Sequence, residues 1–168
     1  MKKQFNLKRN VTVLIVSFML FMFSTVHSYG QNDPVCNQLI ESTKSFFNNL
    51  KEKNLNIAEL DKLTHDEAVI ILGNGTIHEP PASSSGKRDF SGFKGKDRQM
   101  IVNEVTINNI YAKKLDDKVV SVYGEADIQG TLKGISGKAT STFSFIYLLK
   151  ADGTWQIVQI QMTRHSKK

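Results

Sequence analysis

Two runs of strand-forming residues around a short turn, near the C-terminal end, restrict the possible folds most strongly. Residues 138–165 have the sequence KATSTFSFIYLLKADGTWQIVQIQMTRH. Aromatic and β-branched residues alternate with polar ones on both sides of Asp152-Gly153, which is the pattern of a β-hairpin with a tight turn. Each strand would have about 10 residues, longer than the usual 5–6. Strands of this length favour a curved sheet, so the sequence predicts a curved antiparallel sheet.

Two amphipathic helices are expected ahead of this sheet. Residues 34–53 carry apolar side chains at helical spacing, with Asp33 as the N-cap and Pro34 at the first helical position. A shorter helix at 57–63 follows Asn56, which is a suitable cap with Glu59 three residues later. The first helix is expected to lay its Phe and Leu side chains across the sheet.

The remaining elements complete an α+β order. We expect strands at 68–72 and 76–78, a helix at 96–103, strands at 104–113 and 119–129, and a glycine-rich loop at 130–137. In the strand 104–113, Val105, Ile107 and Tyr111 are expected on one side. The order is α-α-β-β-α-β-β-β-β, in which the helices are segregated from a run of strands. The Pro-, Ser- and Gly-rich stretch 80–95 predicts a long loop, either a solvated insertion or a lid over a pocket.

The N-terminal segment has the parts of a secretory signal peptide. Four basic residues precede an apolar run at 11–23, and small and polar residues follow at 24–30. The apolar run has 13 residues, whereas a membrane-spanning helix needs about 20. We expect cleavage after Ser28 or Gly30, export to the periplasm or the extracellular space, and no stable membrane insertion afterwards. Residues 31–168 would then form one domain.

Charge, cysteine and histidine usage argue against several classes of function. The formal charge of +6 includes four basic residues and no acid in 1–30, which leaves +2 on residues 31–168. This small and scattered surplus gives no reason to expect nucleic acid as a partner. Cys36 is the only cysteine, so no internal disulfide can form, and we expect it buried in the first helix. The four histidines do not fall at ligand spacing, so we expect no metal and no cofactor.

Several short motifs occur in order along residues 33–165. They are Leu63-x-x-Asp66-x-x-Val69, Gly95-Lys96-Asp97, Gly124-x-Ala126-x-Ile128-x-Gly130, Phe143-x-Phe145, Asp152-Gly153-Thr154-Trp155-Gln156-Ile157-Val158 and Thr163-Arg164-His165. Together they resemble the nuclear-transport-factor-2-like superfamily, most closely its DUF4440/SnoaL-like branch. The resemblance implies a cone-shaped domain with a bent sheet wrapped around the helices, a pocket between them, and a homodimer through the outer sheet face. Members include isomerases and dehydratases but also binding and association modules, so the fold alone leaves function open.

Three functions remain open on this basis. The first is an exported domain that binds a small apolar or anionic ligand without catalysis. Its candidate ligand-binding residues are Arg98, Tyr111, Tyr123, Trp155, Arg164 and His165. The second is an isomerase- or dehydratase-like enzyme with Asp66 or His65 as the general base. The third is a dimeric interaction module. Glu125 and Asp127 share one strand face, and a solvated sheet face explains that spacing as well as paired acid-base chemistry does.

Overall fold

The computed structural model describes residues 33–72, 77–78, 90, 100–132 and 134–165. The predicted signal peptide at 1–30, the loop at 80–95 and Arg98 therefore lie outside the described residues. Within these ranges, no helix is long and apolar enough to cross a bilayer.

Both predicted N-terminal helices are present and begin where their caps indicate. Helix α2 spans Pro34–Leu50, and Asp33 Oδ1 accepts hydrogen bonds from the backbone N–H of Val35 at 2.7 Å and of Cys36 at 3.4 Å. Helix α3 spans Ile57–Leu63, and the side chain of its cap Asn56 accepts from the N–H of Glu59. The caps satisfy backbone donors that the first helical turn leaves unpaired.

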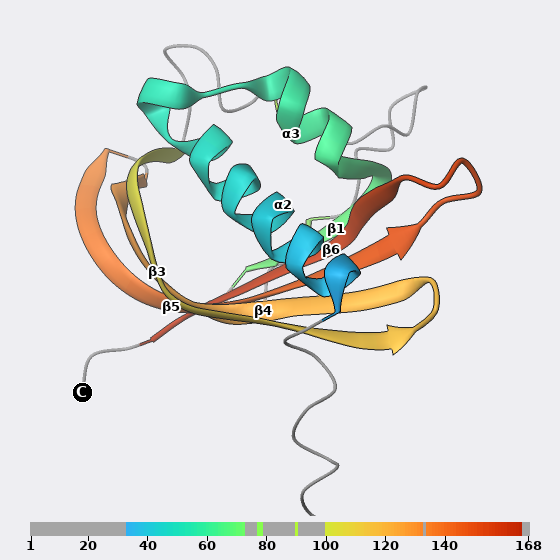
Figure 1. Cartoon of the computed structure of the whole chain (residues 1–168). Coiled ribbons are helices and arrows are strands. Elements are labelled where there is room, and N and C mark those ends of the chain that lie inside the picture. The colour runs from blue at the N-terminus through green and yellow to red at the C-terminus, as the bar shows by residue number, and fades with distance from the viewer. Residues whose placement is uncertain (1–32, 73–76, 79–89, 91–99, 133, 166–168) are drawn as a thin grey trace, which may run out of the picture.

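The sheet has six strands and is mixed rather than purely antiparallel. The strands are β1 Thr64–Leu72, β2 Ile77–His78, β3 Met100–Asp116, β4 Val119–Leu132, β5 Ile135–Leu149 and β6 Trp155–Arg164. Their spatial order is β2-β1-β6-β5-β4-β3. Strand β1 pairs with β6 in parallel, and every other pairing is antiparallel. Figure 1 shows the sheet bending strongly, with α2 and α3 on one side of it. We call that side the inner face and the opposite side the outer face.

The C-terminal hairpin is confirmed, with a turn at Gly153, which has φ of +82°. Two other expectations are wrong. Residues 100–103 of the predicted helix 96–103 begin strand β3, where Ile101 and Val102 pair with residues of β4. The predicted loop 130–137 lies mostly within the β4–β5 hairpin, and Gly130 pairs directly with Gly137. Glycines that suggested a loop are thus members of two long strands.

A β-bulge in β3 overturns the predicted sidedness of that strand. Ile107 pairs with Ala126 while Asn109 pairs with Glu125, so Asn108 is an extra residue without a partner in the ladder. One extra residue reverses the alternation of side chains along the strand. Tyr111 therefore faces the opposite side from Ile107.

The hydrophobic core lies between α2 and one half of the inner face. Phe46 and Phe47 of α2 pack edge-to-face against Phe145 and Phe143 of β5, with ring centroids 5.1–5.5 Å apart. Edge-to-face contacts of this kind add to the free energy of burial. Cys36 is fully buried in the same cluster, as its position predicted.

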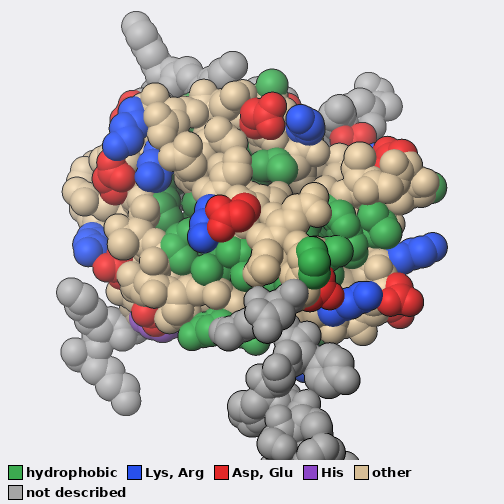
Figure 2. All heavy atoms as spheres, viewed as in Figure 1, with side chains coloured by type: hydrophobic (Ala, Val, Ile, Leu, Met, Phe, Trp, Pro, Cys, Tyr) green, Lys and Arg blue, Asp and Glu red, His purple; other side chains and the backbone are tan. Residues whose placement is uncertain are grey.

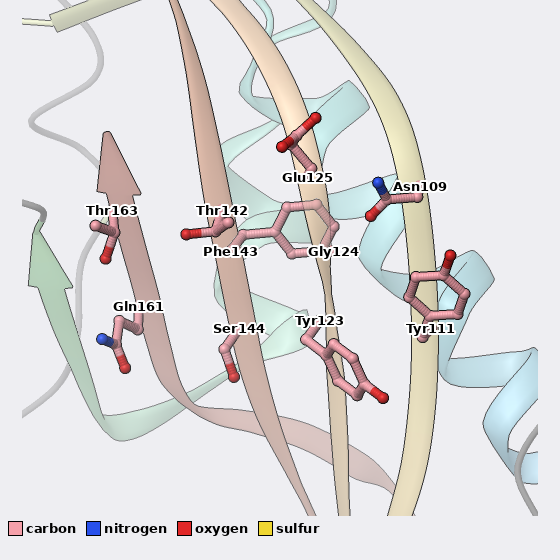
Figure 3. Close-up of a pocket in the computed structure, with 10 residues that line it drawn as sticks. All are labelled: Asn109, Tyr111, Tyr123, Gly124, Glu125, Thr142, Phe143, Ser144, Gln161 and Thr163. Atoms are coloured by element: carbon pink, nitrogen blue, oxygen red, sulfur yellow. The ribbon is translucent and has the colours of Figure 1, made fainter. Parts of the chain in front are cut away.

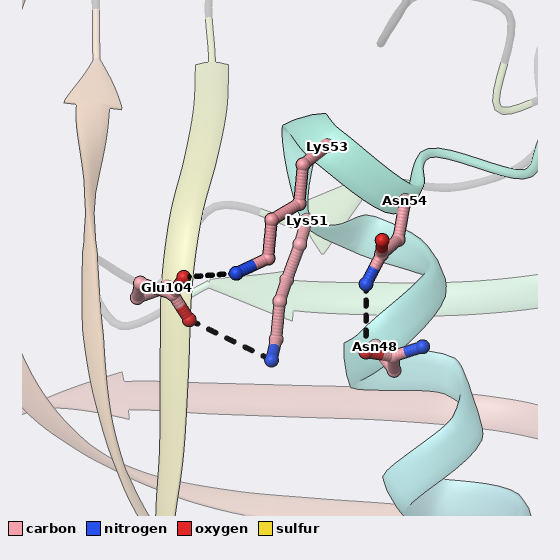
Figure 4. Close-up of polar contacts among 5 residues, drawn as sticks. All are labelled: Asn48, Lys51, Lys53, Asn54 and Glu104. Carbon is pink, nitrogen blue, oxygen red and sulfur yellow. Dashed lines mark hydrogen bonds and ion pairs between the residues drawn. The ribbon is translucent and has the colours of Figure 1, made fainter.

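Ion pairs join the end of α2 to the beginning of β3. A short 3-10 helix, η1 (Glu52–Asn54), follows α2. Lys53 Nζ lies 2.6 Å and Lys51 Nζ 3.6 Å from the carboxylate oxygens of Glu104 in β3 (Figure 4). The hydrogen bond and charge of Lys53 lower the pKa of Glu104. These contacts hold the curled part of the sheet near the helices, although exposed pairs of this kind contribute little free energy.

Candidate functional site

The inner face of the sheet changes character along β4 and β5. Towards the β5–β6 turn, the inner positions carry large side chains that α2 covers, namely Val120, Val122, Phe143, Phe145 and Tyr147, all buried. Towards the β4–β5 turn, the same alternation brings mostly small residues to the inner face, namely Ala126, Gly130, Gly137, Ala139 and Ser141, together with Ile128 and Ile135. Small residues cannot fill the space above the sheet, so this half leaves room for something else.

A hollow of about 380 Å³ lies over this small-residue half, and we call it the inner hollow. Its lining residues are Ile101, Val102, Ile128, Gly130, Thr131, Ile135, Ser136, Gly137, Lys138, Ala139, Ser141 and Arg164. The set contains two basic residues and no acidic one. Figure 1 shows β5 curling upward in this part of the sheet. The inner hollow is therefore mostly apolar with Arg164 at its rim, while the ammonium group of Lys138 pairs with Asp127 of the outer face.

The polar groups of the inner hollow differ in whether they already have partners. Lys138 Nζ lies 2.9 Å from Asp127 Oδ2. Arg164 makes no ion pair with any described residue. Ser141 is only 7 % exposed as a residue, and it lines the hollow.

A second hollow of about 410 Å³ lies on the outer face, and we call it the outer hollow. Figure 3 shows its lining residues, which are Asn109, Tyr111, Tyr123, Gly124, Glu125, Thr142, Phe143, Ser144, Gln161 and Thr163. Tyr111 and Tyr123 are direct cross-strand partners, 45 % and 42 % exposed, with ring centroids 5.9 Å apart and planes 36° apart. Neither helix covers this face (Figure 1), so the paired rings remain in solvent.

The two carboxylates on the outer face of β4 have separate partners. Glu125 Oε1 accepts a hydrogen bond from Asn108 at 3.1 Å, and Glu125 Oε2 lies 3.9 Å from Nδ1 of the exposed His165. Asp127 accepts from Thr140 at 2.7 Å and pairs with Lys138. The hydrogen bond from Lys138 is the main reason why the pKa of Asp127 lies below its usual value. This arrangement resembles a solvated sheet face and not an acid-base pair.

The candidate catalytic residues lie in a third hollow, of about 400 Å³, formed by α3, β1 and the β5–β6 hairpin. Its lining residues are Ala58, Asp61, Lys62, His65, Asp66, Lys150 and Gln156, none of which lines the other two hollows. Asp66 is exposed, and His65 Nδ1 accepts a hydrogen bond from the N–H of Glu67 at 3.1 Å. Catalytic carboxylates usually lie in a buried environment, whereas Asp66 is open to solvent.

The structure separates the residues that the sequence grouped as ligand-binding. Arg164 lines the inner hollow, Tyr111 and Tyr123 line the outer hollow, and His165 lies beside Glu125 on the outer face. Trp155 packs against the core and lines none of the three hollows. Within the described ranges, no group of three His, Cys, Asp or Glu side chains could hold a metal ion.

Sequence reasoning missed Ser141 and the small-residue half of the sheet. The signal was available in the alternation Gly137, Ala139, Ser141, which continues into Phe143 and Phe145 along one strand face. A loop predicted at 130–137 breaks this alternation at Gly137, so the prediction does not show that the small residues continue the face of Phe143 and Phe145.

Comparison with known proteins identifies the fold. No family model and no curated protein matches the sequence. Among solved structures, an NTF2-like protein from Cytophaga hutchinsonii superposes with a TM-score of 0.62 at 15 % identity, over 77 % of this chain and 97 % of that chain. The association domain of C. elegans CaMKII gives 0.53 at 14 % identity, over 76 % and 93 %. A protein from Shewanella frigidimarina provisionally named ketosteroid isomerase gives 0.51 at 18 % identity, over 73 % and 92 %.

These identities are too low to transfer activity, but the superpositions cover most of each chain. The chain therefore has the NTF2-like fold, a cone-like α+β architecture with helices on the inner face of a curved sheet. This confirms the predicted fold class. Proteins that share this fold differ in function, so function has to be argued from the site.

Proposed function

We propose that this protein is a small-molecule-binding domain whose ligand occupies the inner hollow. The observation that carries the proposal is the change from large to small inner-face residues along β5. This change leaves about 380 Å³ of mainly apolar space next to the part of the core that α2 covers. That volume falls within the usual range for small-molecule sites, about 300–1,000 Å³. The motifs that resemble the DUF4440/SnoaL-like branch agree with such a role.

Blocking the hollow tests this proposal. A Cβ atom added at Gly137 would meet no atom within 4 Å, so Gly137→Phe can place a ring in the hollow without a backbone clash. We expect the full chain, purified as the host processes it, to enhance the fluorescence of the neutral apolar probe N-phenyl-1-naphthylamine. Gly137→Phe should abolish the enhancement, and Gly137→Ala should retain it. Equal fluorescence from Gly137→Phe and the unsubstituted protein would contradict a ligand site in the inner hollow.

The enzymatic alternative, with Asp66 or His65 as the base, has less support. Both residues lie at a polar hollow near α3, and Asp66 is exposed to water. An isomerase- or dehydratase-like reaction that used Asp66 would lose its turnover in Asp66→Asn. Binding in the inner hollow would be unchanged in that variant, because the two hollows share no lining residue.

We also propose that two copies of the chain pair through the outer face. Support comes from the exposed Tyr111–Tyr123 pair on a face that neither α2 nor α3 covers. A structural neighbour is itself named an association domain. On the side seen in Figure 2, basic and acidic side chains are interspersed and do not gather into one patch, so this side offers no strong electrostatic docking surface. Light scattering at micromolar concentration should give twice the mass of one chain, and a single-chain mass would contradict the dimer.

For location, we propose export directed by residues 1–30, whose basic start and 13-residue apolar run are typical of a signal peptide. In a bacterial host, the chain recovered from the periplasm or the medium should begin at Tyr29 or Gln31 by intact mass. Retention of the whole N-terminal segment on cytoplasmic protein would contradict export.

A further inference from the structure

We propose that the inner hollow selects ligands with a single acidic head group and a short apolar body, and that Arg164 and Ser141 hold the head group. This inference rests on the proposed function, because it names the class of ligand for the same hollow.

The charges around the inner hollow favour an anion. Its lining contains Lys138 and Arg164 and no Asp or Glu. The charge of Lys138 is already paired with Asp127 at 2.9 Å, whereas Arg164 has no ion-pair partner among the described residues. A guanidinium group offers parallel N–H donors that match the two oxygens of a carboxylate or the oxygens of a phosphate.

The register of the sheet brings Arg164 and Ser141 together. Arg164 of β6 is the direct cross-strand partner of Ser141 of β5, two residues from the pair formed by buried Phe143 and half-buried Met162. Because side chains alternate along a strand, Arg164 and Ser141 belong to the same, inner face as Phe143. Direct partners in an antiparallel sheet have Cβ atoms about 4.5–5.5 Å apart. One acidic head group can therefore reach both side chains.

Ser141 supplies a second donor at this point. Ser141 is 93 % buried as a residue and lines the hollow. A ligand oxygen placed between Ser141 and Arg164 would accept hydrogen bonds from both. The apolar body would then lie over Gly130, Gly137 and Ala139.

The outer hollow provides an internal contrast. Its lining contains Glu125 and no lysine or arginine. Of the two hollows, the inner one therefore has a cationic side chain without an ion pair among the described residues, Arg164, and an acidic ligand is favoured there. The volume of the inner hollow, about 380 Å³, has room for a small ligand such as octanoate. The uncharged counterpart of octanoate is 1-octanol.

Competition between these two probes tests the inference. Octanoate and 1-octanol are titrated against N-phenyl-1-naphthylamine bound to the full chain, purified as the host processes it. We expect octanoate to bind about tenfold or more tightly than 1-octanol, since hydrogen bonds to charged groups contribute more than neutral ones. Arg164→Gln should remove this preference and leave the affinity for 1-octanol unchanged. Arg164→Lys should retain part of it, and Lys138→Gln should retain it nearly in full.

Each outcome decides between the two proposals. If octanoate shows no preference over 1-octanol while Gly137→Phe blocks both, the hollow binds ligands but does not select acids, and the inference is overturned. If Arg164→Gln still prefers octanoate to 1-octanol by the same factor as the unsubstituted protein, the role of Arg164 is overturned. If neither probe displaces the dye and Gly137→Phe leaves dye binding intact, the proposed function fails and the inference fails with it. Circular dichroism on each variant verifies that the fold is intact.

Discussion

At the scale of single residues, the most informative polar contact lies inside the core. Thr43 Oγ1 donates a hydrogen bond to the carbonyl of Leu39 at 2.9 Å, so the 2.8 Å contact between Thr43 Oγ1 and the hydroxyl of Tyr147 has Tyr147 as donor. Burial raises the pKa of Tyr147. The folded protein therefore holds the phenol proton more tightly than the unfolded chain does.

We predict that Tyr147→Phe lowers the free energy of unfolding by about 1 kcal/mol at neutral pH, the usual net contribution of one hydrogen bond. The contribution of Tyr147 is complete below the unfolded-state pKa of about 10 and declines as pH rises above it, because ionisation is disfavoured in the fold. Urea unfolding at pH 7 and pH 11 should show a smaller difference between the two proteins at pH 11. Tyr123→Phe, at an exposed position, serves as the control. If Tyr147→Phe lowers the free energy of unfolding equally at both pH values, the ionisation of Tyr147 is not coupled to folding.

Residues that act locally could be predicted from the sequence. Asp33 and Asn56 cap helices, and Gly153 forms a turn, because each needs only its near neighbours to be recognised. Asn108 could not be assigned as a bulge in the same way. Its position depends on Gly124 of the neighbouring strand, where a Cβ atom would lie 2.1 Å from the carbonyl oxygen of Asn109. Only the register of β3 against β4 brings Asn109 and Gly124 close together.

At the scale of whole elements, three glycines of the β4–β5 hairpin have different roles. Gly124 and Gly130 allow β3 to approach β4 closely, since an added Cβ would lie 2.1 Å and 2.2 Å from carbonyl oxygens of β3. Gly137 faces open space. Two of these positions are required for pairing of the strands, and the third leaves the inner hollow open.

We predict that Gly124→Ala lowers the free energy of unfolding by about 1–3 kcal/mol, because the backbone of β3 has to move away from the added methyl group. Gly137→Ala should change it by less than about 0.5 kcal/mol, as is usual for a substitution that meets no neighbour. Thermal unfolding followed by circular dichroism measures both variants under the same conditions. Equal losses in the two variants would contradict a specific close contact at Gly124.

The elements that were wrongly predicted share one physical cause. Residues 100–103 and 130–137 have little strand pattern of their own. Residues 100–102 of β3 pair with 130–132 of β4, which in turn pair with 135–137 of β5. The long hairpin of β5 and β6 carries a strong local alternation, and it was predicted correctly. The parallel pairing of β1 with β6 involves residues about 90 positions apart, so local pattern could not reveal it.

At the scale of the whole molecule, one sheet presents two faces with separate properties. The α+β class and the NTF2-like fold could be anticipated, since order of elements and short motifs suffice for them. The candidate site was anticipated only in part: Arg164, Tyr111 and Tyr123 were named, but their division between an inner and an outer hollow follows from bulges and register.

We predict that the double substitution Tyr111→Ser with Tyr123→Ser converts the proposed dimer to a monomer, because the paired rings supply a large apolar surface on the outer face. Sedimentation velocity over a tenfold range of concentration measures the shift. Leu115→Ser, an exposed apolar residue at the β3–β4 turn outside the outer hollow, is the matched control. Should the double variant remain a dimer, the second copy would have to bind elsewhere.

On the inner face of β4 and β5, one half packs against α2, and the small-residue half borders the inner hollow. This division also affects how such a chain can diverge in evolution. Substitutions near Phe143, Phe145 and Tyr147 disturb the core and are expected to be removed by selection. Substitutions around Gly137 and Ala139 change the shape and charge of a cavity while the core stays intact. A lineage can therefore change the cavity through substitutions in the small-residue half while it keeps its architecture. This agrees with a fold that is shared with the Cytophaga hutchinsonii protein at 15 % identity.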